Sequence, residues 1–183
     1  MQRLLIPGAA LLIIVVMVIS GYNTLVGMNE YVDARWAQVE NQLQRRADLI
    51  PNLVNTVKGY AAHEKEAIQA VADARARLAG ARTPAEMGQA DGELSGAISR
   101  LLMVAENYPN LKADQNFRAL QDELSGTENR LAVARKDYNE SVQTYNTKLR
   151  AFPAMFYASS MGFTAREYFR AEEGAKAVPE VKF

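Results

Sequence analysis

The chain has 183 residues, with 21 Lys and Arg against 21 Asp and Glu, so its formal net charge is zero. A balanced charge without a basic block argues against a nucleic-acid partner, because phosphate neutralisation needs clustered cations. The absence of cysteine excludes disulfides, thiol catalysis and lipidation on a cysteine, and a single histidine excludes multi-histidine metal sites. We expect no cofactor.

The N-terminal segment is apolar and uncharged. Between Arg3 and Glu30 lie 26 residues without charge, which as a helix would reach roughly 39 Å, enough for a hydrocarbon core of ~30 Å. We predict a transmembrane anchor over residues 1–28. Its membrane-facing side chains would be Leu4, Leu5, Ile6, Leu11, Leu12, Ile13, Ile14, Val15, Val16, Met17, Val18 and Ile19, with Tyr22 at headgroup depth.

A cleaved secretory signal is the alternative interpretation of this segment. Val18-Ile19-Ser20 forms a weak cleavage site before Gly21, but the uncharged stretch continues beyond it, which favours a retained anchor. Arg3 precedes the anchor, whereas Glu30 and Asp33 follow it, and this difference predicts a cytoplasmic N-terminus with the remaining chain outside. We therefore expect a single-pass membrane protein whose main domain lies outside the cytoplasm.

Apolar residues recur every 3.5 positions from Glu30 to Gly80, which predicts helix with a coiled-coil-like seam. The register holds across Pro51, which favours one long helix kinked there over two helices that meet at Asp48–Pro51. The seam is interrupted at Arg46 and Glu64. Either these long side chains reach solvent from the edge of a bundle, or they form a buried charged layer.

Capping signals divide the rest of the chain into further helices. Thr83-Pro84-Ala85-Glu86 is a capping box, and the turn at Asn107–Asn110 precedes a long helix from Leu111 to Arg150 that Pro153 stops. Thr164-Ala165-Arg166-Glu167 predicts a short helix bearing Tyr168 and Phe169. We expect an all-α fold: an antiparallel bundle of long helices over residues 29–174, followed by an extended tail over 175–183.

Candidate chemistry is sparse, and we predict that the protein is not an enzyme. His63-Glu64 lacks the second histidine that a zinc motif of this type needs one turn later. Arg45 and Arg46 are candidates for binding lipid phosphates or an acidic partner, although a local ion pair with Asp48 or Glu40 is the favoured interpretation.

A second candidate interaction site is crowded with apolar side chains. Either it caps the bundle core or it forms an exposed docking patch. Its residues are Phe152, Met155, Phe156, Tyr157, Met161 and Phe163.

These features resemble the LemA family over nearly all of residues 20–183. The matching motifs are Gly21-Tyr22-Asn23-Thr24-Leu25-Val26, Arg45 to Val54, Val57 to Glu64, Tyr108 to Ala113, Glu128-Asn129-Arg130, Asp137-Tyr138-Asn139, Tyr145-Asn146, Phe152-Pro153, Gly162-Phe163 and Pro179 to Phe183. Some relatives carry a lipidated cysteine before the Gly-Tyr-Asn element, but here Ile19-Ser20 stands there, so the helix itself must be the anchor.

The resemblance implies a membrane helix, a four-helix bundle and no established catalytic residue. Relatives are often encoded beside a membrane metallopeptidase or a protein with a TPM-type domain, so the resemblance implies such a partner. Family descriptions have placed the bundle domain in the cytoplasm. We expect a membrane-anchored, self-associating scaffold or adaptor of the cell envelope. The alternative is an enzyme, or a subunit of an envelope-maintenance complex that works with such a metallopeptidase.

Overall fold

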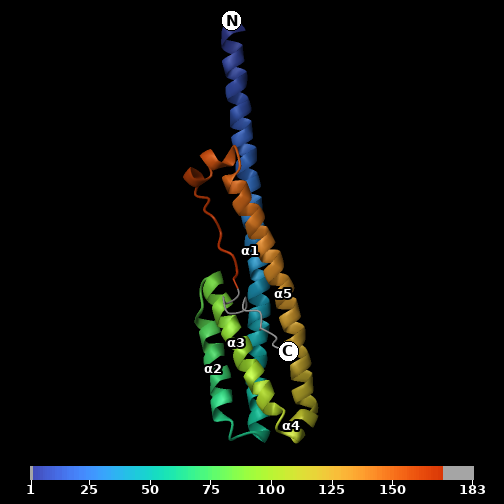
Figure 1. Ribbon diagram of the computed structural model, residues 1–183. Coiled ribbons are helices and arrows are strands. Elements are labelled where there is room, and N and C mark those ends of the chain that lie inside the picture. Colours follow the sequence, from blue (N-terminus) through green and yellow to red (C-terminus); the bar gives the residue numbers. More distant parts are fainter. Residues whose placement is uncertain (1, 171–183) are drawn as a thin grey trace, which may run out of the picture. The chain divides into compact units, whose positions relative to one another are not determined.

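The computed structural model describes the backbone of residues 2–170 and the surroundings of Gly8, Ala9 and residues 11–170. Within this range the chain is helical and contains no strand, which confirms the all-α prediction (Figure 1). The elements are α1 (Gln2–Tyr60), α2 (Lys65–Gly80), α3 (Pro84–Ala105), α4 (Pro109–Ala113), α5 (Gln115–Arg150) and the 3₁₀ turns η1 (Ala154–Phe156) and η2 (Ser159–Met161).

The chain divides into two compact units. Among the described residues, the first combines Gln2–Ala37 with Lys136–Glu167, and the second combines Gln38–Arg135 with Tyr168–Arg170. Both long helices therefore contribute to both units. The predicted tail over residues 175–183 lies outside the described residues.

Helix α1 continues through Pro51, as the unbroken register predicted. It ends at Tyr60, however, and not at Gly80, because the chain turns at Ala61–Glu64, where the Glu64 amide donates to the Ala61 carbonyl at 3.1 Å. The apolar seam alone could not show this break, since α2 resumes the pattern immediately afterwards. Glu64 interrupts the seam because it lies in the turn.

The second unit is a bundle of four helical segments: α1 from Gln38, α2, α3 and α5 up to Arg135. Thr83 begins α3 with the predicted capping box, in which the Glu86 amide donates to Thr83 Oγ1 at 3.2 Å and the Glu86 carboxylate accepts from the Thr83 amide. Seam side chains fill the interior, and burial of each contributes about 1.5–3 kcal/mol. Those without solvent exposure include Leu53, Val57, Val71, Leu94, Leu101 and Leu131.

The helix predicted from Leu111 is divided in two. Helix α4 is a single short turn after Tyr108, and α5 begins beyond Asp114, whose carboxylate accepts from the Phe117 amide at 2.9 Å. This is an N-cap contact, which satisfies a backbone donor at the start of α5. The predicted end at Arg150 is confirmed.

The first unit pairs the N-terminal part of α1 with the C-terminal part of α5, and the two run antiparallel. Leu25, Val32 and Val142 are fully or almost fully buried between them. The rings of Trp36 and Tyr138 pack with their centroids 5.0 Å apart. Beyond α5 the chain turns through η1 and η2 and passes back along this pair (Figure 1).

The short helix predicted from Thr164 is wrong. Residues 163–170 have no helical turn. Their backbone groups bond to α5 instead: Tyr138 donates its hydroxyl to the Glu167 carbonyl at 2.8 Å, and Asn146 bonds both backbone groups of Arg166. A capping box favours a helix only where no neighbouring side chain competes for the same backbone groups.

Candidate functional site

The N-terminal part of α1 exposes a continuous apolar surface. Leu11, Leu12 and Ile13 are 64%, 65% and 59% exposed, and the helix is long and apolar enough to cross a membrane by length and composition. Further along the helix, Leu25, Val32 and Val39 are buried. The other predicted anchor residues that are exposed are Ile14, Val15, Val16, Met17, Ile19 and Tyr22, while Val18 is half-buried and the side chains of Leu4, Leu5 and Ile6 lie outside the described ones.

The apolar cap, defined here as residues 151–163, follows α5 and contains no charged residue. Phe152 and Phe156 are 75% and 73% exposed and meet edge to face, and Met155 and Met161 of the same segment are also exposed. Tyr157 and Phe163 are half-buried. Two aromatic side chains of the cap therefore pack inward and four apolar ones are exposed, while docking of a partner on them stays a prediction.

The cap is held on α1 where the apolar surface of that helix ends. Phe163 packs against Tyr22 with ring centroids 5.5 Å apart. The Tyr157 ring approaches Gly21 so closely that a β-carbon at Gly21 would overlap the Tyr157 hydroxyl. Gly21 is therefore the residue that lets the cap lie directly on the helix.

Arg166 ties the chain beyond the cap to both helices. Its guanidinium donates to Asn29 Oδ1 at 3.1 Å and forms an ion pair with Asp33 on α1. Its backbone N–H and C=O bond to the buried side-chain amide of Asn146 at 2.9 and 2.8 Å. Sequence reasoning missed this role because it assigned Arg166 to the first turn of a helix.

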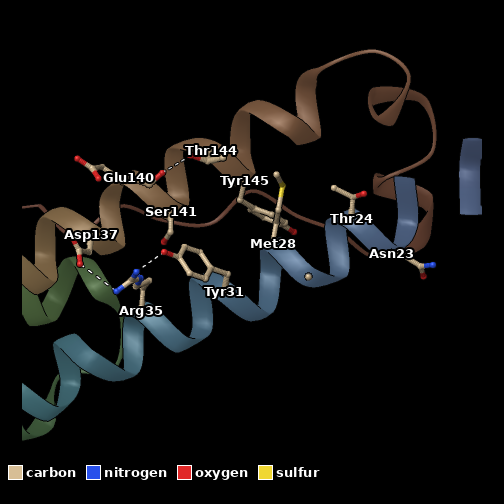
Figure 2. Close-up of a pocket in the computed structure, with 11 residues that line it drawn as sticks. Asn23, Thr24, Met28, Tyr31, Arg35, Asp137, Glu140, Ser141, Thr144 and Tyr145 are labelled. Carbon is tan, nitrogen blue, oxygen red and sulfur yellow. Dashed lines mark hydrogen bonds and ion pairs between the residues drawn. The ribbon is translucent and has the colours of Figure 1, made fainter. Parts of the chain in front are cut away.

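A groove of about 600 Å³ lies between α1 and α5 within the first unit. Figure 2 shows Met28, Tyr31 and Arg35 of α1 facing Asp137 and Tyr145 of α5. Arg35 donates to Asp137 Oδ2 at 3.3 Å and to the Tyr31 hydroxyl, and this bond to Tyr31 is the main cause of the raised pKa of Arg35. Arg35, the one cation among the described residues that line the groove, is thus bound by Asp137 and Tyr31, which also line it. No sequence motif indicated this groove.

The second unit contains a charged layer made of Arg46, Asp91, Glu128 and Arg135, in which Arg46 and Asp91 are buried and the other two are half-buried. Arg46 Nη1 lies 2.6 Å from Asp91 Oδ1 and 2.7 Å from Glu128 Oε2, and Arg135 forms an ion pair with the other Asp91 oxygen. Burial lowers the pKa of Arg46, against the opposing charge of Glu128. Burial and, secondly, the charge of Arg46 lower the pKa of Arg135 to about 10.

This layer decides between the two interpretations of Arg46. The arginine does not reach solvent from the bundle edge, because only 6% of its side chain is exposed. Arg46 belongs to the charged layer inside the bundle, and so it is not accessible to lipid phosphates or to an acidic partner.

Arg45 and Asp48 are exposed, but not in the arrangement expected. Arg45 Nη2 pairs with Glu123 Oε1 on α5 at 2.7 Å and thereby holds the pKa of Glu123 below its usual range. Asp48 accepts from Gln44 Nε2 at 2.8 Å. The ion pairs expected with Asp48 or Glu40 are therefore replaced by pairs that join α1 to other helices.

The two residues of the His63-Glu64 motif lie in the turn between α1 and α2. His63 is exposed between α1 and α2, and Glu64 accepts from the Tyr108 hydroxyl at 2.8 Å, which raises the pKa of Tyr108. Among the side chains that the structure describes, no three His, Asp or Glu come together as a metal site.

The fold and these surfaces define a helical-bundle protein whose first helix is long and apolar enough to span a membrane. The LemA family profile matches residues 35–183, and the chain belongs to the LemA family.

Relatives with assigned names match most of the chain. Magnetosome proteins MamQ 1 and MamQ 2 of Paramagnetospirillum magneticum are each 29% identical over 175 residues, which cover 81% of this chain and 64% of theirs. Protein LemA of Metamycoplasma hominis is 25% identical over 134 residues, 71% of this chain and 59% of that protein. The chain thus spans less than two thirds of the length of these relatives.

Proposed function

We propose that the protein is a membrane-anchored scaffold or adaptor of the bacterial cell envelope, without catalytic activity of its own. The observation that carries this proposal is the change of surroundings along one uninterrupted helix. Side chains from Leu11 to Ile19 are mostly exposed, whereas Leu25, Val32 and Val39 on the same helix are buried. A bilayer is the solvent that suits the first group, and protein packing suits the second.

Orientation follows from the charges that flank the anchor. Arg3 precedes the apolar segment, while Glu30 and Asp33 are the first charges after it. This distribution supports a single pass through the inner membrane with the bundle in the periplasm, and a cytoplasmic bundle is the opposite outcome. A membrane metallopeptidase or a TPM-domain protein is the partner class that the family resemblance favours.

Self-association is a further part of this proposal. The seams of the bundle leave few apolar residues for another copy, because Leu43, Leu131 and Val142 are at most 4% exposed within the chain itself. The exposed anchor side chains are the larger free surface, and helices packed through them would form a homo-oligomer inside the bilayer.

Extraction of membranes with alkaline carbonate tests whether the apolar segment anchors the protein in the bilayer. Replacing Ile13 and Val16 with Asp places two charges in the apolar segment, each unfavourable by about 2.5–3.5 kcal/mol at the centre of a membrane helix. We expect the variant to leave the membrane pellet in alkaline carbonate while the unchanged protein stays. Met103→Asp, at an exposed position of α3, is the matched control and should stay in the pellet. Release of the unchanged protein by carbonate would rule out the anchor.

Orientation and assembly need separate measurements. The sequence has no cysteine, so Met103→Cys gives one reactive site in the bundle. An impermeant maleimide applied to intact spheroplasts should label it, and protection until lysis would place the bundle in the cytoplasm. Light scattering in mild detergent should give an oligomer for the full chain, and a monomer would contradict self-association.

A further inference from the structure

We propose that the apolar cap is a second membrane-contacting element, seated among the lipid headgroups and upper acyl chains beside the exit of α1. This inference rests on the proposed membrane anchoring. It assigns the exposed face of Phe152, Met155, Phe156 and Met161 to lipid and not to a protein partner.

Depth along α1 is the first argument. From Leu4 to Tyr22 the helix rises ~27 Å at ~1.5 Å per residue, close to the ~30 Å hydrocarbon thickness of a bilayer. A helix that enters the core at Leu4 therefore leaves it near Tyr22. The cap touches α1 at that level, through Tyr157 at Gly21 and Phe163 at Tyr22.

Contact with the anchor makes the membrane the natural occupant of the patch. Both the cap and the exposed apolar surface of α1 belong to the first unit, so their relation is fixed by that unit's own packing. When α1 spans a bilayer, the cap stands beside the helix where lipid headgroups surround it. A patch of exposed Phe and Met side chains at this level is covered by lipid without any further partner.

The distribution of charge fits the same location. The thirteen residues of the cap carry no charge, while Lys148 and Arg150 end α5 before it. Cations at the edge of an apolar patch suit the phosphates of anionic lipids, and aromatic side chains favour this interface. The cap thus has the composition of an interfacial segment, apolar along its length and basic where it leaves α5.

Fluorescence quenching tests the proposal with the full chain. Because the protein has no cysteine, Phe156→Cys can be labelled alone with the polarity-sensitive dye NBD. The labelled protein is reconstituted in vesicles of phosphatidylcholine and phosphatidylglycerol. We expect blue-shifted emission and several-fold stronger quenching by a nitroxide on the upper acyl chain than by aqueous iodide.

Two matched positions separate the possible failures. Ile13→Cys reports the anchor, and Met103→Cys reports an exposed apolar position on α3. If Ile13 is quenched from lipid while Phe156 is quenched by iodide as Met103 is, the cap proposal is overturned and the anchor stands. If Ile13 itself is quenched by iodide, the proposed anchoring fails. If neither quencher reaches Phe156, a protein surface covers the patch and the lipid assignment is wrong.

The basic residues at the α5 end of the cap provide an independent measurement. Lys148→Gln with Arg150→Gln, added to the labelled Phe156→Cys protein, removes charge without altering the apolar patch. Raising the phosphatidylglycerol content should strengthen quenching from lipid in the parent protein and have less effect in this variant. An equal response in both would contradict the role of these cations.

Discussion

Arg46 of α1 and Asp91 of α3 form an ion pair inside the second unit, with Arg46 Nη1 2.6 Å from Asp91 Oδ1 and side-chain exposures of 6% and 2%. Arg135 of α5 binds the other oxygen of the same carboxylate. One aspartate therefore bridges the buried Arg46 and the half-buried Arg135 from two different helices, and Glu128 supplies the second negative charge. A charged group at this position links three helices of the bundle, which an apolar side chain in the same seam would not do.

Removing this aspartate should be strongly destabilising. In Asp91→Ala the buried Arg46 and the half-buried Arg135 lose the carboxylate that they share and keep only Glu128, and breaking a buried pair by removing one partner costs about 3–5 kcal/mol. Urea unfolding in detergent, followed by circular dichroism, measures the loss. Glu123→Ala is the control, because it breaks the exposed pair with Arg45 and should change the midpoint little. Equal losses in the two variants would contradict the special role of Asp91.

Gly88 and Gly96 on α3 offer a matched pair of substitutions. A methyl group at Gly88 would overlap the Arg170 carbonyl oxygen, whereas one at Gly96 meets nothing within 4 Å. Gly88→Ala should displace Phe169, which is 4% exposed and lies under the Arg135 guanidinium at 4.9 Å, with a loss of about 1.5–3 kcal/mol. Gly96→Ala should stabilise the helix by about 1 kcal/mol. Thermal unfolding of both variants checks the opposite signs.

The sequence could predict the helices because their apolar residues recur with a regular period and their ends carry capping residues. Thr83 and Glu86 form their box as expected, since both partners lie within one turn. The charged layer was different: Arg46 was visible as an interruption of the seam, but its partner Asp91 lies 45 positions further on. Local pattern cannot choose between a solvated and a buried arginine when the partner comes from another helix.

The cap and the groove show the same limit at the candidate site. The crowding of apolar residues after α5 was readable, yet the division between inward Tyr157 and outward Phe156 depends on the close approach to Gly21. The groove lined by Arg35 and Asp137 arises only when α1 and α5 pair. Its charged residues have ordinary helical spacing, so no motif distinguished them from solvated positions.

Asn146 gives a physical reason for one of the motifs that carried the family resemblance. Its amide bonds both backbone groups of Arg166 and is 3% exposed, so Asn146→Ala leaves two peptide groups without partners. We expect a loss of about 1–3 kcal/mol and faster hydrogen exchange at the Arg166 amide. Gln143→Ala, at an exposed position of α5, should change neither. Unchanged exchange at Arg166 in the Asn146 variant would show that the clamp does not hold this segment.

Stability should fall in acid because carboxylates in the second unit have lowered pKa values. The Phe117 amide and then the Tyr60 hydroxyl hold the pKa of Asp114 below its usual range, and the amides of Arg82 and Thr83 do the same for Glu86. A carboxyl whose pKa is lower in the folded state contributes stability above its unfolded pKa, and loses it as the pH falls through the folded value.

The melting temperature should therefore be level near neutral pH and fall below pH ~4. Asp114→Asn keeps the shape of the N-cap of α5 but removes the titrating group, so the melting temperature of this variant should depend less on pH in this range. Asp122→Asn, at an exposed position of the same helix, serves as the control and should follow the parent curve. If Asp114→Asn also follows that curve, the N-cap of α5 is not a source of the acid sensitivity, and the capping box at Thr83 becomes the next position to replace.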